Sequence, residues 1–365
     1  MVEDEKFLSK QIITYIGNKR GLLKEINEEL VLIKERLQVK KLDCADLFSG
    51  SGVVARLLKQ HARVLYVNDL EEYSRIINEC YLSNNSEFDF ISYGFYKEHI
   101  REKMRRGLIE GIIARNYAPL DDENIQFGER VFYTRKNAMR IDTIREEIEK
   151  LPLDKQKYFL APLLYEASVH VNTAGIFKGF YKDVKTGIGK YGGTAENALT
   201  RIKGEIELPL PILSEFECEC KIYQQDTNEL VKLLPHIDVA YIDPPYNQHP
   251  YGSNYFMLNL IVKNKIEGGI SRVSGIPNNW NRSEYNKKAK AIIAFEDLIK
   301  NLDAKYAIIS YNSEGFIRFS EMEEMLKKYG NVRIREISYN TYRGSRNLKN
   351  RDLYVSEYLF VLQKE

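Results

Sequence analysis

The feature that most limits the fold is a strand, a glycine loop, a helix and a second strand in close succession. Residues 41–48 are mainly apolar and predict a buried strand, and Ser49-Gly50-Ser51-Gly52 follows at once. A helix is predicted over 53–61 and a second strand over 63–67, which ends at Asn68-Asp69. Two strands joined by a helix pair in parallel, so the chain is predicted to have an α/β fold.

The glycine loop also indicates a ligand. Glycines let a backbone approach a ligand closely, and the first N–H groups of the next helix are free to bind polar groups. Asp69 ends the second strand, where nucleotide-binding folds carry an acid for the ribose hydroxyls. These residues predict a nucleoside-containing cofactor. Taken alone, they leave open a structural turn or an NAD-dependent dehydrogenase.

A second strand-to-loop junction follows much later. The apolar run 239–242 leads into Asp243-Pro244-Pro245-Tyr246. Proline fixes its own φ and restricts the residue before it, so this loop is stiff. It offers one carboxylate, backbone carbonyls and an aromatic ring. That set suits a planar amino group, hydrogen-bonded at its edge and stacked on its face.

The alternation of strands and helices stops between these two junctions. Basic and aromatic residues mix there, and helices are predicted over 137–150 and 155–170. The alternation resumes near residue 215, and Asp226 ends the next strand. We therefore divide the chain into a cofactor-binding half (1–84), a helix-rich insertion (85–214) and a catalytic half of the same α/β domain (215–365).

Composition limits the class of protein. The chain has 365 residues, of which 44% are hydrophobic, enough for a substantial core. No run approaches the roughly 18 apolar residues of a membrane span, and the acidic start lacks a signal peptide's apolar centre. We therefore expect a cytoplasmic protein with no membrane partner. The four cysteines show no zinc spacing, so no metal site is expected.

The net charge of +2 carries no information, but the charge distribution does. Residues 332–339 and 355–362 predict two final strands, most simply an antiparallel hairpin. From Arg333 to Arg351 there are six basic residues and one acid, with tyrosines among them. Such a run is either a solvated face or a surface for nucleic acid.

Several separated segments together resemble one family. Tyr15-Ile16-Gly17-Asn18-Lys19-Arg20 and Asp46-Leu47-Phe48-Ser49-Gly50-Ser51-Gly52 look like its two cofactor motifs. Asn68-Asp69 looks like its ribose-binding strand end, and Asp243-Pro244-Pro245-Tyr246 like its catalytic tetrapeptide. The segment 172–177 shares its Asn-x-x-Gly-x-Phe spacing. In this order they resemble the Dam-like class of N6-adenine DNA methyltransferases, and the loop after the tetrapeptide resembles restriction–modification members.

The resemblance implies a Rossmann-like class I methyltransferase sheet with helices on both faces and an inserted target-recognition domain. It implies S-adenosylmethionine as cofactor and double-stranded DNA as partner, with a cognate restriction endonuclease as a further candidate partner. The implied catalytic residues are Asp243, Pro244, Pro245 and Tyr246. The implied cofactor-binding residues are Tyr15, Lys19, Asp46, Phe48, Gly50, Gly52, Asp69 and Asp226. The candidate DNA-binding residues are Lys178, Lys182, Lys185, Lys190, Arg343, Arg346, Lys349 and Arg351.

Each part has an expected role. Tyr15, Lys19 and Asp46 would line the methionine end of the cofactor, Asp69 would bind the ribose and Asp226 the adenine. Asp243 and the Pro244 carbonyl would accept the two N–H groups of the target amino group, and Tyr246 would stack on the base. Three alternatives stay open: a methyltransferase acting on RNA, one acting on a protein amide, and a DNA-binding regulator without activity.

Overall fold

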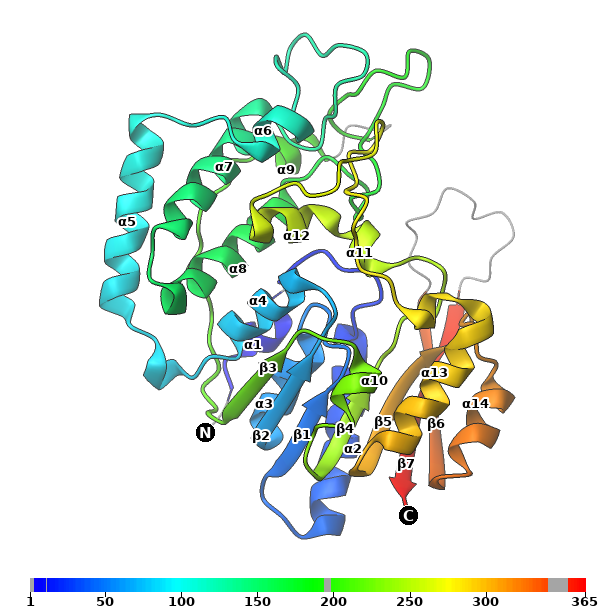
Figure 1. Cartoon of the computed structure of the whole chain (residues 1–365). Helices are drawn as coiled ribbons and strands as arrows, with labels where there is room; N and C mark the ends of the chain where they lie inside the picture. The colour runs from blue at the N-terminus through cyan, green and yellow to red at the C-terminus, as the bar shows by residue number, and fades with distance from the viewer. Residues whose placement is uncertain (1–2, 11, 194–197, 341–353) are drawn as a thin grey trace.

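The computed structural model describes residues 3–10, 12–193, 198–340 and 354–365 and builds them around one seven-stranded sheet (Figure 1). The strand order is β3-β2-β1-β4-β5-β7-β6. The first five strands in that order (β3, β2, β1, β4 and β5) are parallel, and β7 is antiparallel to both β5 and β6. The strands are β1 (Leu42–Asp46), β2 (Ala62–Asn68), β3 (Glu219–Tyr223), β4 (Ile237–Ile242), β5 (Ala304–Asn312), β6 (Gly330–Asn340) and β7 (Tyr354–Lys364).

Helices cover both faces of the sheet, as the sequence predicts. The helices are α1 (Glu5–Ser9), α2 (Leu23–Leu37), α3 (Val53–His61), α4 (Glu72–Tyr81), α5 (Phe90–Arg106), α6 (Ile112–Tyr117), α7 (Arg135–Glu149), α8 (Leu153–Val169), α9 (Leu199–Lys203), α10 (Thr227–Leu230), α11 (Tyr251–Asn254), α12 (Phe256–Lys263), α13 (Lys288–Asn301) and α14 (Phe319–Leu326). Short 3-10 turns are η1 (Arg20–Leu22), η2 (Asn85–Glu87) and η3 (Glu284–Asn286). The predicted α/β fold class is confirmed.

Neighbouring residues on one strand show why both faces are covered. Cys44 packs into the apolar cluster beneath α2 and α3, whereas Ala45 packs into the cluster beneath α13 and α14. Val239 and Ala240 divide in the same way on β4. Strand side chains alternate with a period of two. A strand buried on both faces is therefore apolar at most positions, which is the pattern that predicts these strands.

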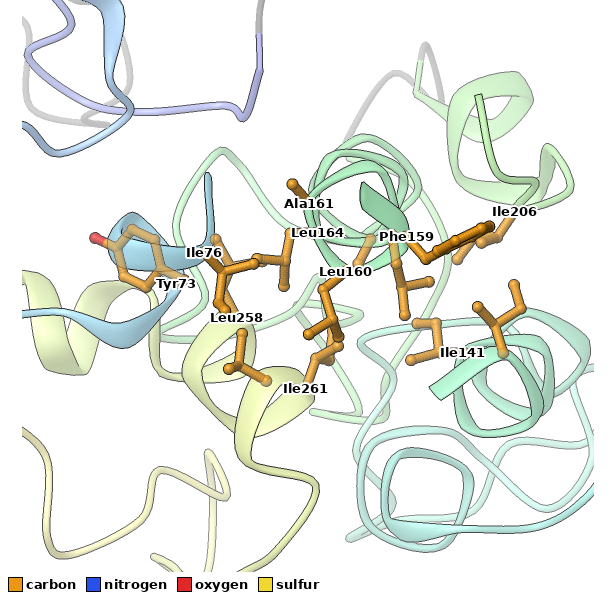
Figure 2. Packing of buried hydrophobic residues seen from close by; sticks show 14 of the residues in the cluster. Tyr73, Ile76, Ile141, Phe159, Leu160, Ala161, Leu164, Ile206, Leu258 and Ile261 are labelled. Carbon is orange, nitrogen blue, oxygen red and sulfur yellow. The ribbon is translucent and has the colours of Figure 1, made fainter. Parts of the chain in front are cut away.

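The insertion forms a helical layer beyond the carboxyl ends of the parallel strands (Figure 1). Its core includes two helices from outside residues 85–214, because α4, α8 and α12 are in mutual contact. Tyr73 of α4 and Leu258 of α12 lie in the same buried cluster as Leu160 and Leu164 of α8 (Figure 2). One continuous apolar cluster therefore joins the helical layer to the elements beside the sheet.

Some elements differ from their predicted extent. Helix α12 lies in a stretch where no helix is predicted; six of its eight residues are buried, and only Asn259 and Lys263 form a narrow polar side. Strand β3 begins at Glu219 rather than at 215, because residues 215–218 form a bend and do not pair with β2. The predicted final hairpin is confirmed by the pairing of β6 with β7. None of the described helices is long and apolar enough to cross a membrane.

Candidate active site

A cavity lies at the carboxyl ends of β1 and β4, with about 860 Å³ of space that is partly open to solvent. These two strands are neighbours where the strand order reverses. Open α/β sheets bind their ligands in the crevice at this point. The lining comes from residues 15–19, 46–54, 69–71, 225–227, 241–251 and 281–286. Segments from both ends of the chain therefore meet in one site.

Two glycines shape the loop between β1 and α3. Gly50 has a φ of 52° and Gly52 a φ of 75°, both in the left-handed region. A Cβ atom at Gly50 would lie 2.8 Å from the Tyr15 ring, and one at Gly52 would lie 2.6 Å from Oδ1 of Asn78. Both the conformation and the space therefore require glycine. The loop brings the start of α3, where Val53 lines the cavity, close to any ligand.

Asp69 connects this loop to the turn after β2. Its Oδ2 accepts the Gly50 N–H at 2.7 Å and its Oδ1 accepts the Glu71 N–H at 2.8 Å. Burial raises the pKa of Asp69 to about 6, although these backbone hydrogen bonds oppose the rise. A carboxylate oxygen accepts more than one hydrogen bond. Asp69 therefore retains acceptor capacity for a pair of hydroxyl groups.

Asp46 is the last residue of β1 and is 1% exposed. Neither of its carboxylate oxygens accepts a hydrogen bond of normal geometry from the described residues. Burial and the nearby Asp243 and Asp69 raise the pKa of Asp46 well above its usual value, and the backbone amides of Phe48 and Ala55 offset this in part. An unsatisfied buried carboxylate is costly. This one suits a cationic ligand group such as an ammonium.

Asp226 has two functions available to it. Its Oδ1 caps α10 by accepting the N–H groups of Asn228 at 2.9 Å and Glu229 at 3.3 Å. The residue also lines the cavity, close to Tyr285, whose ring meets Phe48 edge to face at 5.2 Å. The helix cap does not use Oδ2, so Asp226 can accept a further hydrogen bond from a ligand.

Asp243 directly follows β4 and forms a buried ion pair. The Lys19 Nζ lies 3.2 Å from Asp243 Oδ1, and the same Nζ lies 2.7 Å from Oε1 of Glu357 on β7. Burial raises the pKa of Asp243 to about 7, and Lys19 limits that rise. Burial acts to lower the pKa of Lys19, but Asp243 and Glu357 outweigh it and the pKa is raised. Asp243 is thus a desolvated acceptor whose charge depends on its neighbours.

The rest of the tetrapeptide is held from several sides. The Tyr246 carbonyl accepts the Phe316 N–H at 3.0 Å, and its ring meets the Tyr311 ring at 6.1 Å with an interplanar angle of 69°. Asn286 donates to the carbonyl of Asn247 at 2.7 Å. These contacts fix the loop beside the cavity, which suits a site that orients a substrate.

A family model for the D12 class N6 adenine-specific DNA methyltransferases matches residues 15–325. The chain belongs to this class. Type II methyltransferase M.NlaIII of Neisseria lactamica is 28% identical over 96% of this chain and 99% of its own length. M.CviAII of Paramecium bursaria Chlorella virus 1 is 30% identical over 97% of this chain and 99% of its own length.

A longer relative is also similar to this D12-class methyltransferase. Modification methylase StsI of Streptococcus sanguinis is 29% identical over 96% of this chain, which spans 52% of that protein. Among solved structures, a precorrin 8w decarboxylase from Methanobacterium thermoautotrophicum aligns over 99% of both chains, with 12% identity and a TM-score of 0.27. That score supports no conclusion about the D12-class enzyme.

Most of the predicted site residues of the D12-class methyltransferase meet in the one cavity. Those that line it are Tyr15, Lys19, Asp46, Phe48, Gly50, Asp69, Asp226, Asp243 and Pro245. Gly52 shapes the loop but does not itself line the cavity. Pro244 and Tyr246 are the sequence neighbours of the lining residue Pro245. Lys19 lies here too, but its ammonium faces Asp243 and Glu357. The sequence interpretation, which assigned Lys19 to the methionine end, does not include this ion pair.

The predicted DNA-binding residues divide into two groups. Lys182, Lys185 and Lys190 lie on a small hairpin in which residue 182 pairs with residue 189. Lys182 and Lys185 are exposed, whereas Lys190 and Lys178 are half-buried. The Phe177 N–H, next to Lys178, donates to the Asn254 carbonyl at 2.8 Å, so this side of the insertion adjoins the loop after the tetrapeptide. The other group, Arg343, Arg346, Lys349 and Arg351, lies outside the described residues.

Other lining residues of the D12-class enzyme could not be assigned from the sequence. Glu71 accepts a hydrogen bond from Asn259 at 2.5 Å and one from Asn281 at 3.2 Å, and burial raises its pKa to about 7. Asn281 also donates to the Leu70 carbonyl. The segment 281–286 is polar and without pattern, so no sequence signal places it over the cavity. Only the position of Glu71, two residues after Asp69, could have indicated a role.

Proposed function

We propose that this D12-class methyltransferase transfers a methyl group from S-adenosylmethionine to N6 of an adenine flipped out of duplex DNA. One observation carries the proposal: a single cavity holds the carboxylates that fit the donor, Asp46 and Asp69, and the carboxylate that fits the acceptor, Asp243. Asp46 and Asp243 are close enough for each charge to affect the other. A donor and an acceptor bound there would be held side by side, which removes much of the entropic barrier to reaction.

The donor side fits the methyl donor group by group. S-adenosylmethionine supplies an electrophilic methyl group on a positively charged sulfur. Asp46, with no partner of normal geometry, would accept the ammonium of the methionine moiety. Asp69 would accept the ribose hydroxyls, and Gly50 allows the close approach that this requires. Asp226 would accept the adenine amino group beside the Phe48 ring, and Tyr15 lines the methionine end.

The acceptor side explains how a poor nucleophile becomes reactive. The lone pair of an exocyclic adenine amino group is delocalised into the ring. Asp243 and the carbonyl of Pro244 would each accept one N–H, which orients the nitrogen and directs its lone pair toward the methyl group. Stacking on Tyr246 would contribute about 1–3 kcal/mol and offset part of the cost of flipping the base, a few kcal/mol.

Gly50→Ala should weaken cofactor binding and destabilise the fold. The new Cβ would meet the Tyr15 ring, and the left-handed conformation alone costs about 1–2 kcal/mol for a residue other than glycine. Gly94→Ala on α5 is the control, because its Cβ would meet nothing within 4 Å. Thermal unfolding and calorimetric titration with S-adenosylmethionine would compare them. Equal behaviour of the two variants would contradict the proposed approach of the loop to the cofactor.

Duplex DNA would lie across the helical layer and the loop after the tetrapeptide. The hairpin with Lys182 and Lys185 offers two exposed ammonium groups on that side. Phosphate contacts position a protein on DNA without reading its sequence. We propose that Lys178, Lys182, Lys185 and Lys190 contact the backbone, together with Arg343, Arg346, Lys349 and Arg351, and that the rest of the insertion reads the bases.

Lys182→Ala combined with Lys185→Ala should flatten the salt dependence of DNA binding. Losing two phosphate contacts lowers the slope of log K against log salt by about 1.8. Lys327→Ala with Lys328→Ala, at the end of α14, makes the same change in net charge away from the insertion and should leave the slope unchanged. Fluorescence anisotropy at several salt concentrations measures both. If the two double variants gave the same slope of log K against log salt, the hairpin would not be part of the DNA interface.

We propose that the enzyme is the modification enzyme of a restriction–modification system. The support comes from relatives that are named as type II methyltransferases and modification methylases. A cognate restriction endonuclease that acts on the same site would then be a functional partner. The cytoplasm would then be the place of action.

The proposed function has a direct test. The purified protein is incubated with methyl-labelled S-adenosylmethionine and PCR-amplified DNA, RNA or protein, and the products are digested and separated. We expect label in N6-methyladenine from DNA alone. Label in RNA or protein would overturn the proposed substrate. Single-molecule sequencing of the methylated DNA would then give the recognition site, and an endonuclease blocked by that methylation would support the restriction–modification role.

A further inference from the structure

The ammonium of Lys19 lies between two carboxylates from distant parts of the chain. Asp243 follows β4 and Glu357 belongs to β7. The side chains of Lys19, Asp243 and Glu357 are only 6%, 17% and 6% exposed. Removing one member of a buried ion pair leaves an uncompensated charge. The charges on Lys19 and Asp243 therefore depend on the groups around them.

Glu357 is the fixed end of this arrangement. The Ser310 hydroxyl donates to its Oε1 at 2.8 Å, and the Asn312 side chain donates to its Oε2 at 3.3 Å. Both donors lie on β5, which pairs with β7 in a register that places Asn312 opposite Glu357. Two interior strands of the sheet thus hold the carboxylate in place. Lys19, whose long side chain is flexible by nature, is anchored by it.

The groups that face Asp243 carry one positive charge among the described residues. They are Lys19, Glu357, Asp46 of β1, Tyr241 of β4, Tyr246 and Tyr251. Burial raises the pKa of Asp243, Lys19 lowers it and Glu357 raises it. A neutral carboxyl group would present an O–H in place of an acceptor. Lys19 therefore favours the form of Asp243 that can accept an adenine N–H.

We propose that Glu357 is a positioning residue for methyl transfer: it holds Lys19 against Oδ1 of Asp243, and Lys19 in turn fixes the orientation of the Asp243 carboxylate, with Oδ2 left for the substrate. The proposal rests on the role proposed above for Asp243. Neither Lys19 nor Glu357 need touch the cofactor for this. Their effect reaches the reaction through the charge and the orientation of Asp243.

The test is the pH dependence of kcat/KM for PCR-amplified DNA, measured from about pH 5.5 to about pH 10, which reports ionisations of the free enzyme. The wild type should lose activity below about pH 7, where Asp243 takes up a proton. Lys19→Met should move this acid limb of the pH–activity profile to higher pH. Its activity should be at least about tenfold lower at pH 7 and should recover at alkaline pH. Lys19→Arg should keep the wild-type limb.

Glu357→Gln should move the limb the opposite way, to lower pH, because it removes a negative charge near Asp243. It should also lower kcat by about tenfold while the cofactor Kd stays unchanged, since Lys19 loses its anchor. Glu336→Gln on β6 is the matched control, an exposed carboxylate whose partner across the hairpin is Tyr358, next to Glu357. Glu336→Gln should change neither the position of the acid limb nor kcat. Opposite shifts are not expected from variants that only loosen the structure.

The outcomes separate this proposal from the proposed function. If Asp243→Ala is inactive but the limb stays in place in Lys19→Met and Glu357→Gln, the positioning role is wrong and the role of Asp243 stands. If Asp243→Ala is fully active, the role of Asp243 is wrong. Thermal unfolding identifies variants that do not fold. Should Glu357→Gln be one of them, the comparison of Lys19→Met with Lys19→Arg decides, and identical pH profiles for those two would overturn the proposal.

Discussion

Asp243→Ala is expected to lower the single-turnover rate of adenine methylation by at least about 100-fold, with little change in cofactor affinity. The magnitude follows from the loss of one preorganised electrostatic contact to the reacting group, which in other enzymes costs about 10²–10³ in rate. Cofactor affinity should hold because Asp46 and Asp69, not Asp243, are the carboxylates proposed to bind the donor in the shared cavity. Rapid-quench measurement with labelled methyl donor separates the chemical step from product release.

Asp238→Ala is the control for this variant. Asp238 lies near the start of β4, the strand that Asp243 directly follows, and accepts the Asp43 N–H at 2.9 Å. Its loss should destabilise β4 to a similar degree and leave the rate near that of the wild type. Two results would contradict the mechanism. One is full activity of Asp243→Ala, and the other is an equal loss in both variants, which would trace the effect to the strand.

Asp69→Ala should raise the dissociation constant for S-adenosylmethionine by about 10–100-fold and leave DNA affinity unchanged. Hydrogen bonds to a charged group contribute about 1.5–3 kcal/mol, and Asp69 is the residue proposed to bind the ribose. The variant should also lose stability, because the amides of Gly50 and Glu71 lose their acceptor. Calorimetry for the cofactor and anisotropy for DNA give the two affinities.

Asp69→Asn separates the two effects. It keeps the side-chain volume and one oxygen, so one of the two backbone amides keeps its acceptor and the loss of stability should be smaller than in Asp69→Ala. It loses the charge, so its cofactor affinity should remain well below the wild-type value. Equal weakening of cofactor and DNA binding in both variants would contradict the assignment of Asp69 to the ribose.

The sequence could predict the parts of the fold that follow a local rule. Strands buried on both faces read as largely apolar runs, and the helix Val53–His61, whose N-cap is Gly52, begins and ends where predicted. Helix α12 could not be found, because burial on nearly every side removes the contrast between polar and apolar positions. The short α10 ends at Leu230, although the apolar Leu233 and Leu234 predict a helix over 228–234.

The candidate site likewise contains residues that the sequence marks and residues that it does not. Gly50, Asp69 and Asp243 were predictable because a special backbone conformation or a strand end marks them in the sequence. Glu357 was not, since one glutamate in an alternating strand looks like any solvent-facing residue. Its importance arises from register: the pairing of β7 with β5 places it opposite Asn312 and within reach of Lys19. Contacts between residues more than 300 positions apart leave no local pattern to find.

The cluster shared by α4, α8 and α12 bears on how target specificity can be exchanged among such enzymes. A chimera that replaces residues 85–214 alone would bring a foreign α8 against the resident Tyr73 and Leu258. Any mismatch in that interface would act on α4, which starts three residues after Asp69, and on α12, which follows the catalytic loop. Successful grafts should therefore carry α4 and α12 with the insertion. Recombination within this class would then be constrained by packing rather than by the edges of the inserted sequence.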